Sequence, residues 1–242
     1  MSARARLGVF AAGALGLTAL LAWGFAGLPA FGDFHGAYGT LLPHTAPSER
    51  HTANVVAAVV FDYRGFDTIG EELILFCAVM GVALLLRDVR DEDTRGVVDR
   101  VRSDALRAVG LVAAPVVVLL ALDLIAHGYL TPGGGFQGGV AAAAGLLLVY
   151  LAGEWRAFRL SYPDRLIDPA EATGAGGFLV VGLAMLLAGG AFLENLLPLG
   201  TFGKLTSGGA IPIENWCVGL EVSAAFVLLF LEFLEEVMSE GR

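Results

Sequence analysis

Six runs of about 20 mainly apolar residues divide this 242-residue sequence, and they constrain the fold more than any other feature. A helix needs about 20 such residues to cross the hydrocarbon core of a bilayer, where every backbone polar group must be bonded within the protein. The runs lie at Leu7–Leu28, Thr68–Leu86, Leu106–Leu130, Gly134–Leu151, Ala172–Leu193 and Glu214–Leu234. The sequence therefore predicts an all-α integral membrane protein with about six transmembrane helices.

The composition agrees with a chain whose solvent is lipid. Charged residues make up 16% of the chain, against about a quarter in soluble domains. The formal net charge of −9 argues against nucleic acid as a partner, because binding to phosphates needs a surplus of basic residues. Cys77 and Cys217 lie inside apolar runs without CxxC or Cys/His spacing, so we expect small core residues, no metal site and no cofactor.

The distribution of basic residues predicts the orientation. The first run follows the segment MSARAR and is too long for the apolar part of a secretory signal peptide, so we expect it to stay as a helix. With the N-terminus inside, twelve basic residues fall on the cytoplasmic side, and only Arg50, Arg64 and Lys204 fall outside. Short cytoplasmic loops carry the excess of Lys and Arg in membrane proteins. Six spans then place both the N- and the C-terminus in the cytoplasm of a prokaryotic cell.

A charged segment predicts how the chain is divided. The stretch RDVRDEDTRGVVDRVRSD, residues 87–104, mixes both signs as a solvated connector does. We expect a two-helix region over 1–90, a charged cytoplasmic linker over 91–104 and a four-helix domain over 105–242. Asn54–Phe61 is apolar but too short to span, and we expect it to form a helix at the interface or against its neighbours.

Ionisable side chains inside the runs are candidates for function, because charge is costly within a bilayer. Asp123 and His127 lie four residues apart and so share one face of a helix. This pair fits proton transfer near neutral pH. It equally fits a neutral histidine that bonds to the carboxylate and holds two helices together.

Two adjacent glutamates, Glu71 and Glu72, follow Asp67 and Thr68 at the start of the second run. An N-terminal capping arrangement explains one of the glutamates, since negative charge is favoured near a helix N-terminus. Adjacent residues point about 100° apart around a helix, so we expect at least one of the two to face the protein interior. Cation or proton handling by Asp67, Glu71 and Glu72 is the functional interpretation.

Glu221 lies about two turns into the last run, without another charge within four residues. A glutamate there must be protonated, paired with another helix or directed into a hydrated cavity, so it is a further candidate for the ion pathway. Glu232 lies near the inner end of the same run, and we expect it to reach water.

The stretch HGYLTPGGGFQGGV, residues 127–140, places a glycine-rich turn between two apolar runs. The proline suits the first turn of a helix, and the glycines let the backbone approach neighbouring helices closely. Direct ion contact through a side-chain amide or through backbone carbonyls is the alternative. We expect mainly a packing role for Pro132, Gly133, Gly134, Gly135, Phe136, Gln137, Gly138 and Gly139.

The sequence TPGGGFQGGV resembles the PGGGF-x-GG signature of the MnhB/MrpB subunit of multisubunit Mrp-type sodium/proton antiporters, and is similar to small subunits of membrane-bound hydrogenases. This resemblance extends over residues 106–234. Separately, VVFDYRGFDTIGEE resembles the VDFRGFDTLGE motif of the membrane segment that precedes MrpB, at the C-terminal end of MrpA. The chain departs from the family at Tyr129, where a histidine is common, and at Gly219, where an aspartate is common.

The resemblance implies a helical accessory subunit of an ion-pumping complex related to respiratory complex I. Such a subunit is no enzyme by itself; it lies in the lipid bilayer with other subunits and helps to form the pathway of Na⁺ and H⁺. In the motif VVFDYRGFDTIGEE, the resemblance implies functional interest in four residues: Asp62, Arg64, Asp67 and Glu71. Two alternatives stay open: an ion-translocating subunit of a complex I-like or hydrogenase-type redox complex, and a purely structural assembly subunit.

Overall fold

The computed structural model describes residues 3–28, 30–32, 36–90, 103–161 and 164–240. These residues form helices and connecting loops without any strand, so the all-α prediction is confirmed for the described part of the chain. The helices are α1 (Ala3–Ala26), α2 (Ala37–Arg50), α3 (Val55–Ala58), the π-helical turn η1 (Val59–Tyr63), α4 (Gly65–Arg90), α5 (Asp104–Ala126), α6 (Gly135–Ser161), α7 (Asp164–Leu187) and α8 (Ile211–Glu240).

Six of the described helices are long and apolar enough to cross a membrane, as the sequence predicts. They are Arg4–Ala26, Gly65–Leu86, Asp104–Ala126, Gly135–Gly153, Pro169–Leu187 and Ile211–Leu234. The side of the membrane on which each terminus lies stays a prediction. Most of the predicted linker 91–104 lies outside the described residues, and the predicted division into regions also stays a prediction.

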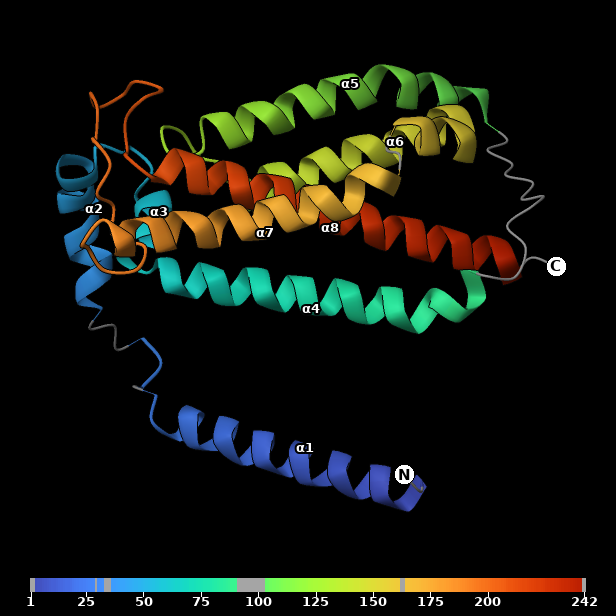
Figure 1. Cartoon of the computed structure of the whole chain (residues 1–242), viewed down its shortest axis with the longest axis horizontal. Coiled ribbons are helices and arrows are strands. Elements are labelled where there is room, and N and C mark those ends of the chain that lie inside the picture. Colours follow the sequence, from blue (N-terminus) through green and yellow to red (C-terminus); the bar gives the residue numbers. More distant parts are fainter. Residues whose placement is uncertain (1–2, 29, 33–35, 91–102, 162–163, 241–242) are drawn as a thin grey trace. The chain divides into compact units, whose positions relative to one another are not determined.

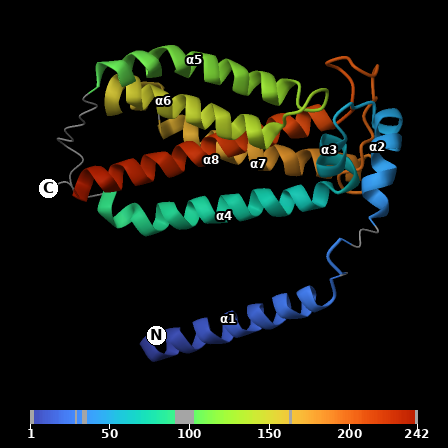
Figure 2. The ribbon, with the colours of Figure 1, turned by 180° about the vertical axis from the view of Figure 1, so that it is seen from behind.

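The chain forms two compact units, residues 1–41 and 42–242. In the first unit, α1 is apolar on all sides and exposed along its whole described length. A helix that is apolar all round is suited to lipid. In the second unit, α4 to α8 run alongside one another as a bundle (Figures 1 and 2).

The last helix, α8, is the centre of the bundle. It contacts α4, α5, α6 and α7 (Figure 1). More than half of its most apolar stretch is buried, 56%, against at most 28% in each of the other four spans of the bundle. Four polar side chains of α8 are buried among the neighbouring helices: Glu214, Asn215, Glu221 and Glu232.

Several connections gather at one end of this bundle, here called the loop end: residues 42–64, 127–134 and 188–210 (Figure 1). The short helix expected over Asn54–Phe61 is present as α3 and η1, and it packs inward through Ala57, Ala58 and Phe61. Asn54 starts this helix by accepting hydrogen bonds from the Val56 and Ala57 amides. It is thus a helix packed against its neighbours.

Some predicted boundaries are wrong. Pro132 lies in the turn before α6 and not in its first helical turn, because α6 begins at Gly135. The fifth span ends at Leu187 instead of Leu193, since the chain turns there through Gly189, whose φ of +95° is accessible mainly to glycine. Cys77 is exposed on the outer face of α4 and is not a core residue, whereas Cys217 is half-buried.

Candidate functional site

Two asparagines hold the glycine-rich turn in place, and Asn54 does so from the loop end. Its side-chain amide donates hydrogen bonds to the carbonyls of Gly128 (2.6 Å) and Thr131 (3.2 Å), and its backbone N–H donates to Tyr129 O at 3.0 Å. The Thr52 hydroxyl donates to the same Tyr129 carbonyl. The segment that resembles the end of MrpA is thereby bonded to the glycine-rich turn.

Asn215 holds the other side of the turn from the first turns of α8. Its side chain is fully buried; Oδ1 accepts from Gly135 N (2.5 Å) and Nδ2 donates to Ile125 O (2.5 Å). One side chain thus ties the end of α5 and the start of α6 to α8. Sequence reasoning missed this residue, because an asparagine in the first turns of an apolar helix looks like a solvated group near its end.

The glycines of α6 lie against neighbouring helices. A Cβ at Gly135 would meet Asn215 O of α8 and stand 2.9 Å from Gly219 N. A Cβ at Gly138 would stand 2.8 Å from Ala121 O of α5. One at Gly139 would stand 2.7 Å from Val222 Cβ of α8. These helices approach each other so closely that side chains larger than glycine do not fit.

A cavity of about 400 Å³ lies where the two sequence motifs meet, and we call it the vestibule. The first motif contributes Thr68, Glu71 and Glu72 from α4. The second contributes the backbone of Gly133–Gly135 and the side chain of Gln137. Two carboxyl groups and one amide in a single cavity provide the oxygen atoms that hydrated or partly hydrated cations prefer.

The capping arrangement, weighed as the alternative for one of the two glutamates, is wrong, because α4 begins earlier than expected, at Gly65. Asp67 lies in the first turn and pairs instead with Arg64 at 2.5 Å. The Thr68 hydroxyl donates to Val60 O (2.6 Å) and so fastens α4 to η1. Glu71 is left on the exposed side of the helix, at the vestibule.

Glu72 faces inward, as expected for one of the two glutamates, and it meets Glu221. Both line a second cavity of about 130 Å³, whose other walls are apolar side chains of α4 and α7. The two carboxyl groups interact directly. Both oxygens of Glu221 and one of Glu72 are buried without a hydrogen-bond donor from the described part of the chain. Glu72 also lines the vestibule, so it borders both cavities.

The burial of three further glutamates was not predicted from the sequence. Glu214 is 1% exposed, and both its carboxyl oxygens lack a donor among the described residues. Glu171 of α7 is 3% exposed; it precedes the predicted fifth span and therefore looked like a loop residue. Glu232 is 5% exposed, so the expectation that it reaches water is wrong: its neighbours in the bundle cover it. Burial of these acids depends on helix packing, which the sequence does not show.

The Asp123 and His127 pair forms as expected from its spacing. His127 Nδ1 lies 2.8 Å from Asp123 Oδ1, and His127 stands at the C-terminal cap of α5. Both side chains are largely outside the bundle, 38% and 65% exposed for His127 and Asp123. Neither lines the vestibule or the second cavity. The structure therefore does not bring this pair together with Glu71, Glu72 and Glu221.

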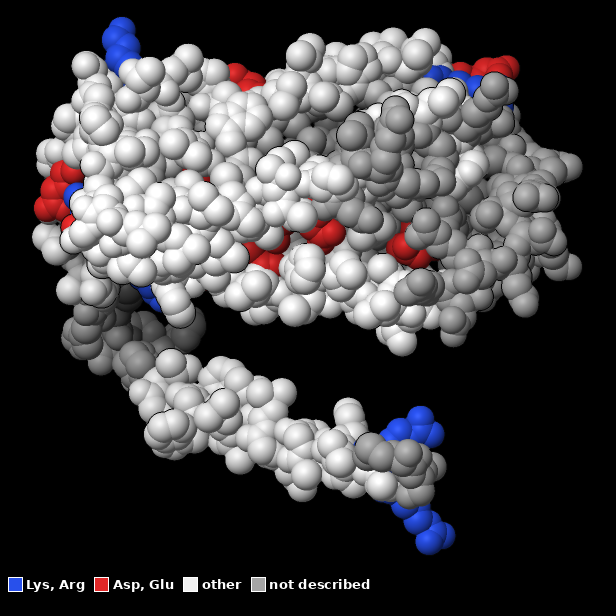
Figure 3. All heavy atoms as spheres, in the orientation of Figure 1, with Lys and Arg blue, Asp and Glu red and all other residues white. Residues whose placement is uncertain are grey.

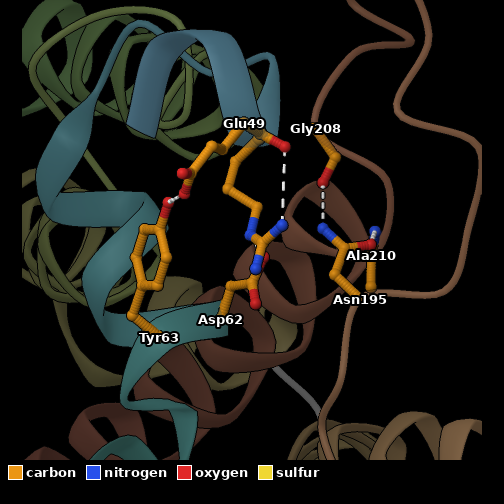
Figure 4. Close-up of polar contacts among 7 residues, drawn as sticks. Glu49, Asp62, Tyr63, Asn195, Gly208 and Ala210 are labelled. Atoms are coloured by element: carbon orange, nitrogen blue, oxygen red, sulfur yellow. Dashed lines mark hydrogen bonds and ion pairs between the residues drawn. The ribbon is translucent and has the colours of Figure 1, made fainter. Parts of the chain in front are cut away.

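A charged cluster closes the loop end above η1 (Figure 4). The guanidinium of Arg50 pairs with Asp62 at 2.5 Å and lies over the ring of Tyr63, whose hydroxyl donates to Glu49 at 2.5 Å. Burial raises the pKa of Asp62, and the Arg50 charge opposes this. Burial and the hydrogen bond to Glu49 raise the pKa of Tyr63 to about 12. The cluster fastens α2 to η1.

Asn195 extends this cluster to the connection between α7 and α8. Its amide donates to Gly208 O and its carbonyl accepts from Ala210 N, both at 2.9 Å (Figure 4). The start of α8, and with it Glu214 and Asn215, is positioned by these bonds.

Residues 105–228 match the family model of a domain related to the MnhB subunit of Na⁺/H⁺ antiporters. This match covers about half of the chain, and it contains the glycine-rich turn and most of α8. The chain belongs to the MnhB-related family.

Two relatives extend beyond that domain. An uncharacterized protein from Methanocaldococcus jannaschii is 34% identical over 215 residues, which cover 78% of this chain and 82% of the relative. A probable K⁺/H⁺ antiporter subunit of the A/B type from Rhizobium meliloti is 30% identical over 208 residues, covering 73% of this chain and 20% of the relative. This MnhB-related chain thus spans a fifth of the length of the Rhizobium protein.

Two solved structures share the fold. A chain of the membrane-bound sulfane sulfur reductase, an archaeal respiratory membrane complex, aligns with a TM-score of 0.68 and 30% identity over 96% of this chain and 99% of that chain. A chain of the Mrp complex from Dietzia sp. DQ12-45-1b aligns with a TM-score of 0.68 and 27% identity over 96% of this chain and 26% of that chain. Both neighbours are parts of multisubunit membrane complexes. With its six apolar helices, the chain is a multi-pass protein of the prokaryotic plasma membrane.

Proposed function

We propose that this MnhB-related chain is a membrane subunit of a cation/proton antiporter complex and that its vestibule forms part of the cation pathway. Family membership and the likeness to an Mrp-complex chain support the first part. In this proposal the chain makes and breaks no covalent bonds. The likeness to the Mrp chain covers 96% of this chain and therefore includes the segment that precedes the MnhB-related domain.

One observation carries the second part: both family-like motifs line the same cavity. Glu71 stands at its exposed side, Glu72 at its buried side, and Gln137 comes from the opposite motif. Carboxylate and amide oxygens can replace water around a cation that moves from the membrane surface inward. A purely structural subunit has no need for a cavity with two carboxyl groups, since buried unpaired charge destabilises packing.

Removal of the vestibule carboxyl groups tests this proposal in the assembled complex. We expect Glu71→Gln and Glu72→Gln each to slow cation-dependent proton exchange in everted vesicles by at least roughly ten-fold. The exchange is measured by fluorescence quenching. Gln137→Leu should raise the cation concentration needed for half-maximal rate. Complex abundance is checked by immunoblot.

Two matched acids serve as controls. Asp104→Asn removes an exposed carboxyl at the start of α5, and Glu194→Gln removes an exposed one that lines neither cavity. We expect near-normal exchange from both. Wild-type exchange by all three vestibule variants at normal abundance would contradict the cation pathway and leave a structural role.

A second candidate function rests on the archaeal neighbour. The sulfane sulfur reductase chain matches this chain over nearly the whole length of both, whereas this chain covers only 26% of the Mrp chain. This likeness favours an ion-translocating part of a respiratory redox complex. Purification of the intact complex distinguishes the antiporter from the respiratory redox complex. Iron–sulfur absorbance in the preparation would favour the redox complex. An active exchanger without this absorbance would favour the antiporter.

A further inference from the structure

We propose that a row of buried carboxyl groups along α8 carries protons through this subunit, and that it meets the cation vestibule only at Glu72. The row consists of Glu214, Glu221 and Glu232 on α8, joined by Glu72 of α4 and Glu171 of α7. This inference rests on the proposed function and adds the route of the proton.

The three glutamates of α8 lie on one face of the helix. Glu214 and Glu221 are seven residues apart, about 20° short of two full turns. Glu221 and Glu232 are eleven residues apart, about 20° beyond three full turns. Each side chain is at most 5% exposed, so this face is covered by neighbouring helices along its length. The row extends from the first turn of α8 to the inner end of its span, Ile211–Leu234.

Acids on two neighbouring helices lie near these positions, Glu72 on α4 and Glu171 on α7. Along α8, the backbone rises about 10 Å from Glu214 to Glu221 and about 16 Å from Glu221 to Glu232. Glu72 stands beside Glu221 in the second cavity. A Cβ at Gly174 of α7 would lie 2.5 Å from Glu221 N, and Glu171 comes one turn before Gly174 on this antiparallel helix. Glu171 therefore lies between the levels of Glu221 and Glu232.

The loop end provides the beginning of the row. Glu214 is close enough to Asp62 for the two charges to interact, and Asp62 belongs to the cluster with Arg50 and Glu49 at the surface. Figure 3 shows acidic atoms at several places along the furrow between α4 and α7, on the face seen in Figure 1. A series of carboxyl groups thus leads from the loop end inward.

The chemistry around Glu72 and Glu221 fits a proton better than a metal cation. A desolvated Na⁺ or K⁺ needs several oxygen ligands, as hard cations generally do. The second cavity offers two carboxyl groups, and its remaining walls are apolar: Ile69, Leu73, Phe76, Ala175, Phe178 and Leu179. One proton between two carboxylates removes half of their charge and supplies the donor that both lack in the described chain. The vestibule, with its amide and its exposed side at Glu71, is the better cation site.

Proton transfer along α8 needs water. After a proton has passed through the whole row, each carboxyl group returns to its starting protonation state. A protonated carboxyl donates its proton to a water molecule, which passes another proton to the next carboxylate. The donor becomes a carboxylate and the acceptor a carboxylic acid, so charge is conserved. The rises of about 10 and about 16 Å along α8 are too long for direct transfer, so water molecules must complete these steps. Glu72 and Glu221 interact directly and need no water between them.

Isosteric variants of the row test this route in the intact complex. We expect Glu214→Gln, Glu171→Gln and Glu232→Gln each to slow proton flux in vesicles by at least roughly ten-fold, with an unchanged apparent KM for the cation. Glu214→Asp keeps a carboxyl group and should recover most of the rate. Asp104→Asn, an exposed acid, is the matched control. If these residues had a purely structural role, the variants would lower the abundance of the complex. They would not lower the rate of proton flux at an unchanged KM and a normal abundance.

Infrared difference spectroscopy gives a measurement that does not depend on transport. The purified complex should show a protonated carboxyl band that disappears in Glu221→Gln. Retention of that band in Glu221→Gln, or wild-type proton flux in both Glu214→Gln and Glu232→Gln, would overturn the proton row. If the vestibule variants slow exchange while the row variants do not, the row is wrong and the proposed cation pathway stands. If Gln137→Leu shifts the KM and the row variants change only the rate, both are supported.

Discussion

Single residues in this protein have roles that their neighbours determine. A Cβ at Gly219 would come within 2.7 Å of Ile125 Cδ1. A larger side chain at this position would require the Ile125 side chain to shift. Glu221, two positions later, faces Glu72 instead. The Glu221 side chain is directed toward α4, and Gly219 packs against Ile125 of α5.

Loss of the Asn215 side-chain amide should destabilise the bundle. Asn215→Leu leaves the buried Gly135 N–H and Ile125 carbonyl without partners, which costs about 1–3 kcal/mol. We expect the purified complex to lose its native-gel band at a lower temperature. Ser223→Ala is the control, because that hydroxyl bonds to the Leu220 carbonyl of its own helix. Equal thermal resistance of Asn215→Leu and the wild type would show that the two bonds contribute little.

At the scale of elements, helix positions are easier to predict than helix ends. The apolar runs locate all six candidate spans, because length and composition determine what can cross a bilayer. The start of α4 lies earlier than the sequence indicates, since Gly65 and Asp67 look like a turn in isolation. Thr68 bonds to Val60 across η1 and lets the helix begin earlier. A contact between elements thus sets the boundary.

Bulky side chains on α6 should separate it from its neighbours. Gly135→Leu or Gly138→Leu would collide with backbone atoms of α8 or α5, which cannot move aside as side chains can. We expect less assembled complex on native gels and reduced transport. Gly176→Leu is the matched control, because a Cβ at this α7 glycine meets nothing within 4 Å. Normal assembly of both α6 variants would contradict the packing role of the glycine-rich turn.

The orientation of the whole molecule follows from charge. With twelve basic residues assigned to the cytoplasmic side and three outside, a single cysteine placed at 93–103 should be shielded from an impermeant thiol reagent in whole cells. A single cysteine at 200–209 should react. Both are introduced into a chain in which Cys77 and Cys217 are replaced by alanine. The reverse labelling pattern would show that the orientation is inverted.

The sequence by itself determined that the chain lies in lipid, how many candidate spans it has and which family it belongs to. Each of these depends on composition or on a short contiguous motif. It also predicted that Glu72 or Glu71 faces inward and that Asp123 meets His127, since both follow from spacing along one helix. Only the tertiary structure decided that Glu72 meets Glu221 and that Glu171, Glu214 and Glu232 are buried. The physical reason is that lipid and protein core are both apolar, so a spanning helix shows no contrast between its two faces. Which acids share a cavity depends on how α4, α7 and α8 are rotated against one another, and close contacts such as Gly174 against Glu221 set that rotation.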